Sequence, residues 1–325
     1  MHLALAPDEG YFRGMACAIF SIVLAADRSQ VLEFHVMDGG IADASWEMLT
    51  RKITALDSGI RFHRHSIALA TFAGLPEAAC GGPMTYARLL MESIIAADEV
   101  IYVDSDFLCF RNLRALWDTP MGSNLIAACQ DRGVKLLKDD PVFELSEEDG
   151  RQLYFNAGLL KANLKAWRQE RVQQRTLALL QDHGAQCLWW DQTALNAICK
   201  GRVLWLDPTF NQYYVQEVTL PELAEGRVNI HFAAKTKPWQ TSDRKVFTDV
   251  LWRVHYRKFT GAGNRAAGLL KPFGTPLIAL LCMARGCLAV FGGNDAAPVR
   301  WIRRRISRIQ MIRWVLKRGT PTASH

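Results

Sequence analysis

Cysteine pairs of the kind that hold zinc or form a redox disulfide are missing from the sequence. The chain has eight cysteines in 325 residues, and none forms a C-x-x-C pair. A chain of this length can bury a large apolar core, and several of the cysteines lie in apolar runs. We therefore expect free, buried thiols in a reducing compartment rather than a disulfide framework. The cysteines are Cys17, Cys80, Cys109, Cys129, Cys187, Cys199, Cys282 and Cys287.

A secretory signal and a long hydrophobic run are also missing. The opening residues MHLALAPDEG carry an acid at position 8 and no lysine or arginine, which is unlike an export signal. The longest apolar run, Leu277 to Phe291, is interrupted by Arg285 and Gly286. It is shorter than the roughly 20 residues that a membrane-spanning helix needs. We expect an interfacial or packed helix in this run.

Acidic residues are missing from residues 300–318, which hold eight lysines and arginines. The formal net charge of the chain is +7, so the remaining residues are close to neutral at −1. Isoleucines and two tryptophans alternate with the arginines, and at helical spacing the isoleucines gather on one side. We predict that residues 300–318 bind an anionic membrane surface, where each basic residue contributes about 1 kcal/mol. Nucleic-acid binding and a solvated basic tail are the alternatives, nucleic acid with the least support.

The first 66 residues alternate between strand-like and helix-like segments. This βαβαβ order predicts an α/β fold with a mostly parallel sheet flanked by helices. Such sheets bind ligands at the carboxyl ends of their strands. Asp43 is a plausible N-cap of the second helix. The expected strands are Leu3–Ala6, Leu32–Met37 and Ile60–Ser66, and the expected helices are Tyr11–Ala26 and Asp43–Leu56.

Further segments follow the same pattern up to a change of composition near residue 262. We expect a catalytic domain over residues 1–262 and an apolar, basic helical extension over 263–325, which associates with membranes. The expected helices are Thr85–Ala97, Lys165–Asp182, Trp190–Lys200 and Asp243–Phe259. The expected strands are Glu99–Val103, Leu125–Cys129, Phe155–Asn163, Val203–Leu206 and Val228–Phe232.

Two aspartates follow a buried strand in the segment EVIYVDSDFLCF. In extended backbone, Asp104 and Asp106 project to the same side, where their charges repel unless a cation neutralises them. Oxygen ligands suit hard divalent ions, and such an ion could stabilise a departing diphosphate. Solvated surface acids are one alternative. A phosphatase of the haloacid-dehalogenase type is another, but that type carries D-x-D on its first strand.

A second strand, in VNIHFAAKTKPW, ends in His231 and is followed by Lys235 and Lys237. A neutral imidazole can act as a third metal ligand, and lysines supply point charges for phosphate. The alternatives are a hydrogen-bonded core histidine and a solvated lysine loop.

Eight segments in sequence order resemble the retaining glycosyltransferases of family 8, particularly bacterial galactosyl- and glucosyltransferases of lipopolysaccharide and lipooligosaccharide assembly. The segments are LALAPDEGY, FHVMDGGI, TYARLL, VIYVDSDFL with LRALWD, YFNAGLLKANLKAWR, WDQTALN, LDPTFN and HFAAKTKPW. The resemblance implies a GT-A fold, a UDP-sugar donor and a Mn²⁺ or Mg²⁺ ion. It implies Asp104, Asp106 and His231 as metal ligands.

The resemblance also implies donor contacts. Ala6, Asp8 and Tyr11 match the uridine pocket, although Asp8 is also a plausible helix N-cap. Further donor positions are Arg88, Ser105, Asp131, Asn156, Ala157, Asp191, Gln192, Ala234 and Lys237. An arginine such as Arg88 on a helix is more often at the surface, and an acid such as Asp191 at a helix start also complements the helix dipole. Two positions depart from the family pattern, Gly10 and Ala234, and both lie near the donor.

Retaining hydrolases keep the configuration by means of two carboxylates about 5 to 5.5 Å apart, one of which is the nucleophile. No such pair is evident here. Gln192 matches the position at the reactive face of the sugar and is a poor nucleophile, and Asp191 would hold sugar hydroxyls. We therefore expect front-face attack by the acceptor hydroxyl, with Lys237 and the metal stabilising the diphosphate.

The family acts on lipid-linked saccharides, so we expect a cytoplasmic protein that is peripheral on the cytoplasmic face of the inner membrane. A catalytically silent nucleotide-sugar or membrane-binding protein on the same fold is the alternative from another class. A self-glucosylating protein of the glycogenin kind is a third possibility.

Overall fold

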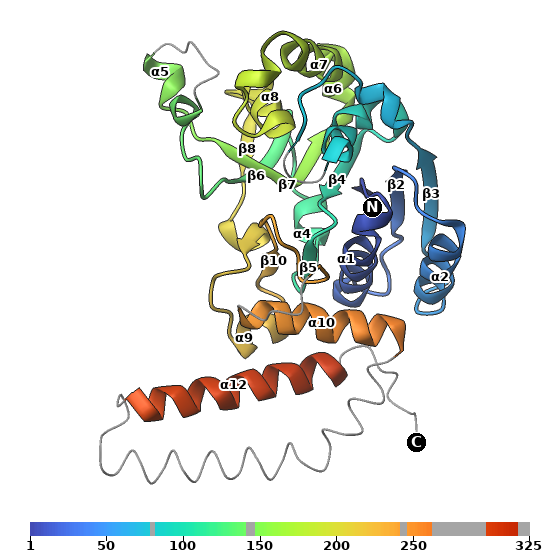
Figure 1. Ribbon diagram of the computed structural model, residues 1–325, viewed down its shortest axis with the longest axis vertical. Coiled ribbons are helices and arrows are strands. Elements are labelled where there is room, and N and C mark those ends of the chain that lie inside the picture. The colour runs from blue at the N-terminus through green and yellow to red at the C-terminus, as the bar shows by residue number, and fades with distance from the viewer. Residues whose placement is uncertain (79–81, 141–146, 241–245, 262–296, 318–325) are drawn as a thin grey trace.

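The chain folds around one large sheet of seven strands, in the order β3-β2-β1-β4-β7-β6-β8 (Figure 1). The computed structural model describes residues 1–78, 82–140, 147–240, 246–261 and 297–317. All neighbouring strands of this sheet are parallel except β7, which runs antiparallel to β4 and β6. The strands are β1 (His2–Leu5), β2 (Glu33–Asp38), β3 (Arg61–Ser66), β4 (Glu99–Val103), β6 (Ile126–Gln130), β7 (Phe155–Asn163) and β8 (Val203–Trp205).

Helices cover both faces of the sheet, as the alternating pattern predicted. One face packs against α1 (Phe12–Ala25) and α2 (Asp43–Thr54), and the other packs against segments between residues 72 and 199. The second group comprises the 3-10 helix η3 (Gly82–Leu90), α3 (Met91–Ile94), α6 (Leu164–Glu170), α7 (Val172–His183) and α8 (Trp190–Cys199). Shorter helices are α4 (Arg114–Trp117), α5 (Glu147–Gly150) and α9 (Leu220–Ala224).

A smaller sheet of three strands brings the D-x-D segment and His231 together. It contains β5 (Phe107–Cys109), β10 (Asn229–His231) and β9 (Gln212–Tyr213), with β10 in the middle. β5 follows Asp106 directly, and the antiparallel register places His231 opposite Phe107. Two segments that are more than 120 residues apart in the chain therefore meet at one point.

Three local predictions are wrong. The single helix expected over Lys165–Asp182 is two helices, because Arg171 adopts a left-handed backbone conformation with φ of 53°. The helix expected over Thr85–Ala97 begins as the 3-10 helix η3 and ends at Ile94, since six of the nine residues of η3 are buried and packing overrides helix propensity. The N-cap of α2 is Ala42, not Asp43, which lies in the first turn and pairs with Arg64. The cap predicted for Asp8 is confirmed, because its carboxylate accepts a hydrogen bond from the amide of Tyr11.

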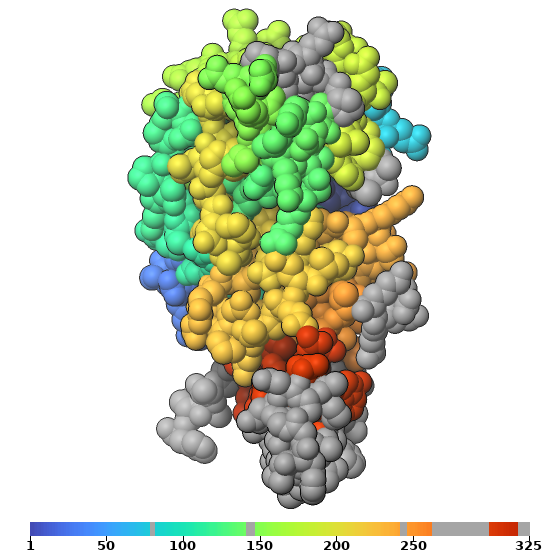
Figure 2. Space-filling view, turned by 90° about the vertical axis from the view of Figure 1, so that its left-hand side faces the viewer, coloured from blue at the N-terminus to red at the C-terminus, as the bar shows by residue number. Residues whose placement is uncertain are grey.

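The basic C-terminal segment is a helix, α12 (Ala297–Lys317), that packs across α10 (Phe247–Thr260) and α9. It lies at the end of the molecule away from α7 and α8, beside the orange surface of α10 (Figure 2). Its buried side chains are Val299, Ile302, Ile306, Met311 and Val315. Part of the isoleucine stripe predicted to face lipid therefore packs inside the protein. None of the helices described by the structure is long and apolar enough to cross a membrane.

The five cysteines within the described residues, Cys17, Cys109, Cys129, Cys187 and Cys199, are buried and form no disulfide, as expected. The apolar run from Leu277 to Phe291, the expected boundary at residues 262 and 263, and the remaining cysteines lie outside the described residues.

Candidate active site

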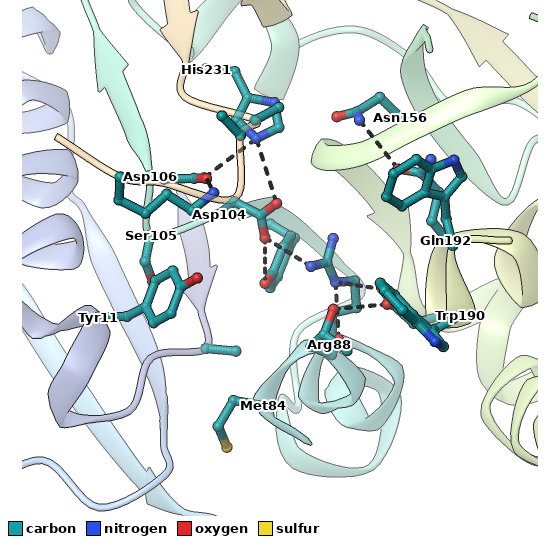
Figure 3. Close-up of a pocket in the computed structure, with 18 of the residues that line it drawn as sticks. Tyr11, Met84, Arg88, Asp104, Ser105, Asp106, Asn156, Trp190, Gln192 and His231 are labelled. Carbon is teal, nitrogen blue, oxygen red and sulfur yellow. Dashed lines mark hydrogen bonds and ion pairs between the residues drawn. The ribbon is translucent and has the colours of Figure 1, made fainter. Parts of the chain in front are cut away.

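A cleft of about 520 Å³ opens at the carboxyl ends of β1 and β4 (Figure 3). Its lining contains every residue that the sequence analysis assigned to a donor or a metal, with the exception of Ala157. Ala157 lies behind the wall, where its amide donates to Oε1 of Gln192 at 2.9 Å and its carbonyl accepts from Arg88 at 2.7 Å. The order of strands thus brings together side chains from eight separate sequence segments.

The two aspartates and the histidine converge on one point of the cleft. Their ligand atoms all lie within 4.8 Å of one another. The Nε2 atom of His231 is 3.3 Å from Oδ1 of Asp106 and 3.8 Å from Oδ2 of Asp104. Oδ1 of Asp106 is buried and has no hydrogen-bond partner among the described residues. Two carboxylate oxygens and an imidazole nitrogen fit a hard or borderline divalent cation, so the residues present could hold such an ion.

Lys237 neutralises part of the charge of this cluster. Its ammonium group is buried and donates to Oδ2 of Asp106 at 2.6 Å and to the carbonyl of Phe232 at 3.1 Å. Burial alone would raise the pKa of Asp106, but the ammonium charge of Lys237, together with the contact to His231, outweighs burial and holds the pKa below its usual range. The alternative of a solvated lysine is therefore wrong for Lys237, whereas Lys235 is exposed at the rim of the cleft.

Gly158 explains how the backbone of β7 can pass so close to the cluster. A methyl group at this position would lie 2.3 Å from Cε1 of His231 and 2.9 Å from Oδ2 of Asp104. Only glycine fits this approach without displacing a side chain. The sequence analysis quoted the segment that contains Gly158 but assigned it no role, because the contact is made across two sheets.

Arg88 links the cluster of Asp104, Asp106 and His231 to Asp191 on another part of the cleft wall. Its guanidinium lies 2.9 Å from Oδ1 of Asp104 and 3.0 Å from Oδ2 of Asp191. Burial lowers the pKa of Arg88, but Asp104 and the other acidic groups around it together outweigh burial, so the pKa is raised and the side chain stays charged. For Asp191, burial acts in the other direction and raises the pKa, and Arg88 and Thr85 oppose that rise. Arg88 is thus a buried residue of the cleft, and the alternative of a surface arginine is wrong.

Three of the expected donor positions, Asp131, Asn156 and Gln192, form a connected hydrogen-bond network with Tyr213, called the sugar-side network below after the role expected of Gln192. Oδ2 of Asp131 accepts from Asn156 at 2.9 Å, from the hydroxyl of Tyr213 at 3.0 Å and from Nε2 of Gln192 at 3.3 Å. Because the amide of Ala157 donates to Oε1 of Gln192, both polar ends of the Gln192 side chain are fixed. Sequence reasoning did not find Tyr213, which follows the LDPTFN segment by two residues.

The wall around Asp8 and Tyr11 is supported by Trp239, a further residue that sequence reasoning missed. The ring of Trp239 meets the ring of Tyr11 edge-on at 5.6 Å, and its indole N–H donates to the carbonyl of Gly10 at 3.1 Å. The same ring lies where a side chain at position 14 would be, so Gly14 leaves room for it. Trp239 belongs to the segment HFAAKTKPW, and its aromatic character was the available signal.

Comparisons with known proteins found a matching family model, similar proteins and similar solved structures. The family model described as Glycosyl transferase family 8 matches residues 2–243. General stress protein A of Bacillus subtilis is 23% identical over 284 residues, which cover 82% of this chain and 97% of that protein. Lipopolysaccharide 1,2-glucosyltransferase of Escherichia coli is 25% identical over 252 residues, 74% of this chain and 72% of that protein. The solved structure of galactosyltransferase LgtC with donor and acceptor sugar analogues is 27% identical with a TM-score of 0.66, covering 79% of this chain and 96% of that one.

Proposed function

This chain belongs to glycosyl transferase family 8 and has the GT-A fold, and from this premise we propose that it transfers a hexose, galactose or glucose, from a UDP-sugar to a saccharide acceptor with retention of configuration. The observation that carries the proposal is the cluster of Asp104, Asp106 and His231 beside the buried Lys237. Three ligands for a divalent cation and one fixed ammonium group match the charge of a nucleoside diphosphate. The acceptor is proposed to be a lipid-linked core oligosaccharide in lipopolysaccharide or cell-envelope biosynthesis.

Each end of the donor has a proposed partner in the cleft. Asp8 accepts the N–H of the uracil ring, Ala6 lies beside it, and Tyr11 stacks on the ring. Ser105 lies between the two metal ligands, and its buried Oγ atom has no hydrogen-bond partner among the described residues. It is therefore available to the donor. Mn²⁺ or Mg²⁺, held by Asp104, Asp106 and His231, would supply positive charge to the departing diphosphate, and Lys237 would add a second positive charge. Ala234 lines the same cleft as a further proposed donor contact.

The geometry at the sugar supports attack by the acceptor from the face where the diphosphate departs. Oε1 of Gln192 is weakly basic and accepts from the amide of Ala157, so it orients rather than attacks. Asp191 is tied to Arg88 and Thr85, which leaves it to hold sugar hydroxyls together with Asp131 and Asn156. Trapping of a covalent glycosyl adduct on Gln192 or Asp191 would overturn this mechanism.

We also propose that α12 brings the enzyme to an anionic membrane surface at the cytoplasmic face of the inner membrane. Arg304, Arg305 and Arg308 are exposed, and Trp301 is 55% exposed. Because Ile302 and Ile306 are buried, contact through charge and Trp301 is favoured over insertion of an apolar helix face. The division into a catalytic domain of residues 1–262 and an extension of residues 263–325 remains part of this proposal.

The test is release of UDP from a panel of UDP-sugars and GDP-sugars, with Mn²⁺ and with EDTA. We expect turnover of one UDP-hexose that depends on Mn²⁺ and falls by at least about 100-fold in Asp106→Asn, because one metal ligand is lost. Asp118→Asn is the matched control, since Asp118 is exposed and, within the described part of the chain, its ion pair is with Arg114 in the i,i+4 position.

Folded protein that binds Mn²⁺ and a UDP-sugar but turns over no donor, with or without saccharide acceptors, would favour the catalytically silent binding protein. Turnover that is equal in EDTA would contradict the proposed role of the metal.

A further inference from the structure

Asn211 has no role so far, although it is buried between the metal cluster and the sugar-side network. It is the last residue of the 3-10 helix η6 (Pro208–Asn211) and is 4% exposed. We propose that Asn211 is a positioning residue that holds the proton of His231 on Nδ1 and so keeps Nε2 free to bind a metal. The proposal rests on the proposed function in one respect only, which is that a metal ion is taken as the partner of Nε2 of His231.

The argument begins at a backbone amide, whose direction of donation is fixed. The amide of Gly158 donates to Oδ1 of Asn156 at 3.0 Å. The other end of that side chain, Nδ2, donates to Oδ2 of Asp131 at 2.9 Å. A backbone N–H cannot accept and an ionised carboxylate cannot donate, so the oxygen and nitrogen of Asn156 can be placed only one way round.

The orientation of Asn156 then fixes Asn211. The oxygen of Asn156 faces the side chain of Asn211 at 2.8 Å, and because an oxygen of this kind only accepts, the atom of Asn211 that meets it is Nδ2. Oδ1 of Asn211 therefore points the other way, where it lies 2.9 Å from Nδ1 of His231. A carbonyl oxygen can only accept, so the proton of the neutral imidazole must be on Nδ1.

With its proton on Nδ1, the imidazole presents a lone pair at Nε2. That lone pair faces carboxylate oxygens of Asp104 and Asp106, at 3.8 Å and 3.3 Å. Three electron-rich atoms are then held together, an arrangement that a divalent cation stabilises. With the proton on Nε2 instead, His231 would donate to Asp106 and could not bind a metal through that atom. Asn211 decides between these two states, in the way that outer-shell partners orient metal-binding histidines elsewhere.

The same two asparagines join the metal cluster to the residues proposed to hold the sugar. The Nδ2 atom of Asn156, which fixes Asn211, also donates to Oε1 of Gln192 at 3.2 Å. Figure 3 shows the two side chains facing each other. The rings of Phe107 and Tyr213 pack on His231 at 4.5 Å and 5.7 Å and limit its rotation. The ring therefore cannot easily turn to exchange its two nitrogens, and the tautomer is set by Asn211.

The test is the tautomer of His231, measured by 15N NMR on the metal-free full chain at about pH 8.5, where imidazoles are neutral. The spectrum of His231→Gln assigns the signal. We expect the Nδ1–H form in the wild type and in Asn211→Asp, whose carboxylate still accepts from Nδ1. In Asn211→Leu we expect the Nε2–H form and Mn²⁺ affinity, measured by electron paramagnetic resonance, about 10- to 100-fold weaker.

Asn196→Leu is the control for structural damage. Asn196 is also a buried asparagine, 2% exposed, but it bonds to the backbone of Phe155 and Gln192 and not to His231. A wild-type His231 in the Nε2–H form, or an Asn211→Leu protein with unchanged tautomer and Mn²⁺ affinity, would overturn the proposal. A failure of the proposed function can be told apart from a failure of this proposal, because the tautomer of His231 in the metal-free protein does not depend on whether any sugar is transferred.

Discussion

At the residue scale, the chemistry of the cleft depends on contacts that join distant parts of the chain. Asp106 gains a lysine 131 positions away, and Asp104 gains Arg88 and Tyr102. The D-x-D spacing predicted a carboxylate pair in need of a cation. It could not show that Lys237 is already 2.6 Å from one of the carboxylates, because that contact forms only when β5 and β10 pair.

Replacing Gly158 with alanine is expected to damage the metal cluster. The new methyl group would overlap the ring of His231 and the carboxylate of Asp104, so one of them must move. We expect Mn²⁺ affinity to fall at least about 10-fold and stability to fall by about 1 to 3 kcal/mol. Mn²⁺ titration by electron paramagnetic resonance and urea unfolding measure the two effects. Gly59→Ala, at an exposed turn, is the control, and an unchanged Mn²⁺ affinity in Gly158→Ala would show that the backbone approach is not needed.

At the scale of elements, three neighbouring strands carry a row of histidines at the edge of the main sheet. His2 of β1 contacts His35 of β2 at 3.0 Å, and His35 contacts His65 of β3 at 3.2 Å. His63 stacks on His35 with ring centroids 4.6 Å apart and bonds to Glu33. Burial, followed by the positive charges that His63, His2 and His65 would carry, lowers the pKa of His35 to about 4, while Glu33 opposes this.

This row predicts a loss of stability in mild acid. The unfolded chain binds a proton on His35 near pH 6.5, and the folded chain does so only near pH 4. Stability is therefore fully present above pH 6.5 and declines as the pH falls toward 4, by about 2 kcal/mol between pH 7 and pH 5. Urea unfolding at the two pH values measures it. The loss of stability should be smaller in His35→Gln but unchanged in His183→Gln, because His183 is an exposed histidine. An equal loss in the wild type and both variants would refute the assignment of the effect to His35.

The pattern of apolar residues predicted most elements of the sheet because β1, β2, β4, β6 and β7 are buried along most of their length. β4 and β7 have the predicted bounds, and β1, β2 and β6 differ by a residue. The break between α6 and α7 was not predictable, because Arg171 carries no sequence signal for a left-handed conformation. Tertiary packing also decided the 3-10 form of η3.

At the scale of the whole molecule, α12 joins the catalytic body through its buried face and leaves its arginines outside. This arrangement predicts binding to vesicles of anionic lipid, measured by sedimentation, and little binding to neutral vesicles. Replacing Arg304, Arg305 and Arg308 with glutamine should weaken binding by about 100-fold at low salt, at about 1 kcal/mol per residue. The effect should be smaller if the pair of Arg304 with Glu217 already uses one of these charges.

The matched control removes the same charge elsewhere, in Arg51→Gln, Lys138→Gln and Lys165→Gln, all exposed in the catalytic body. Equal weakening in the control would mean that net charge, and not α12, attracts the membrane. Binding that does not depend on salt would contradict an electrostatic surface contact.

The sequence by itself determined the class of fold, the family and the side chains that meet in the cleft, because alternating burial and short motifs are local properties of a chain. Tertiary structure alone decided which of these groups touch. The pairing of β5 with β10 brings His231 to the aspartates, and β7 places Gly158 and Asn156 against them. It also gave Asn211 its position between Asn156 and His231. Such contacts depend on strand order and register, which link segments far apart in the chain and leave no spacing to detect.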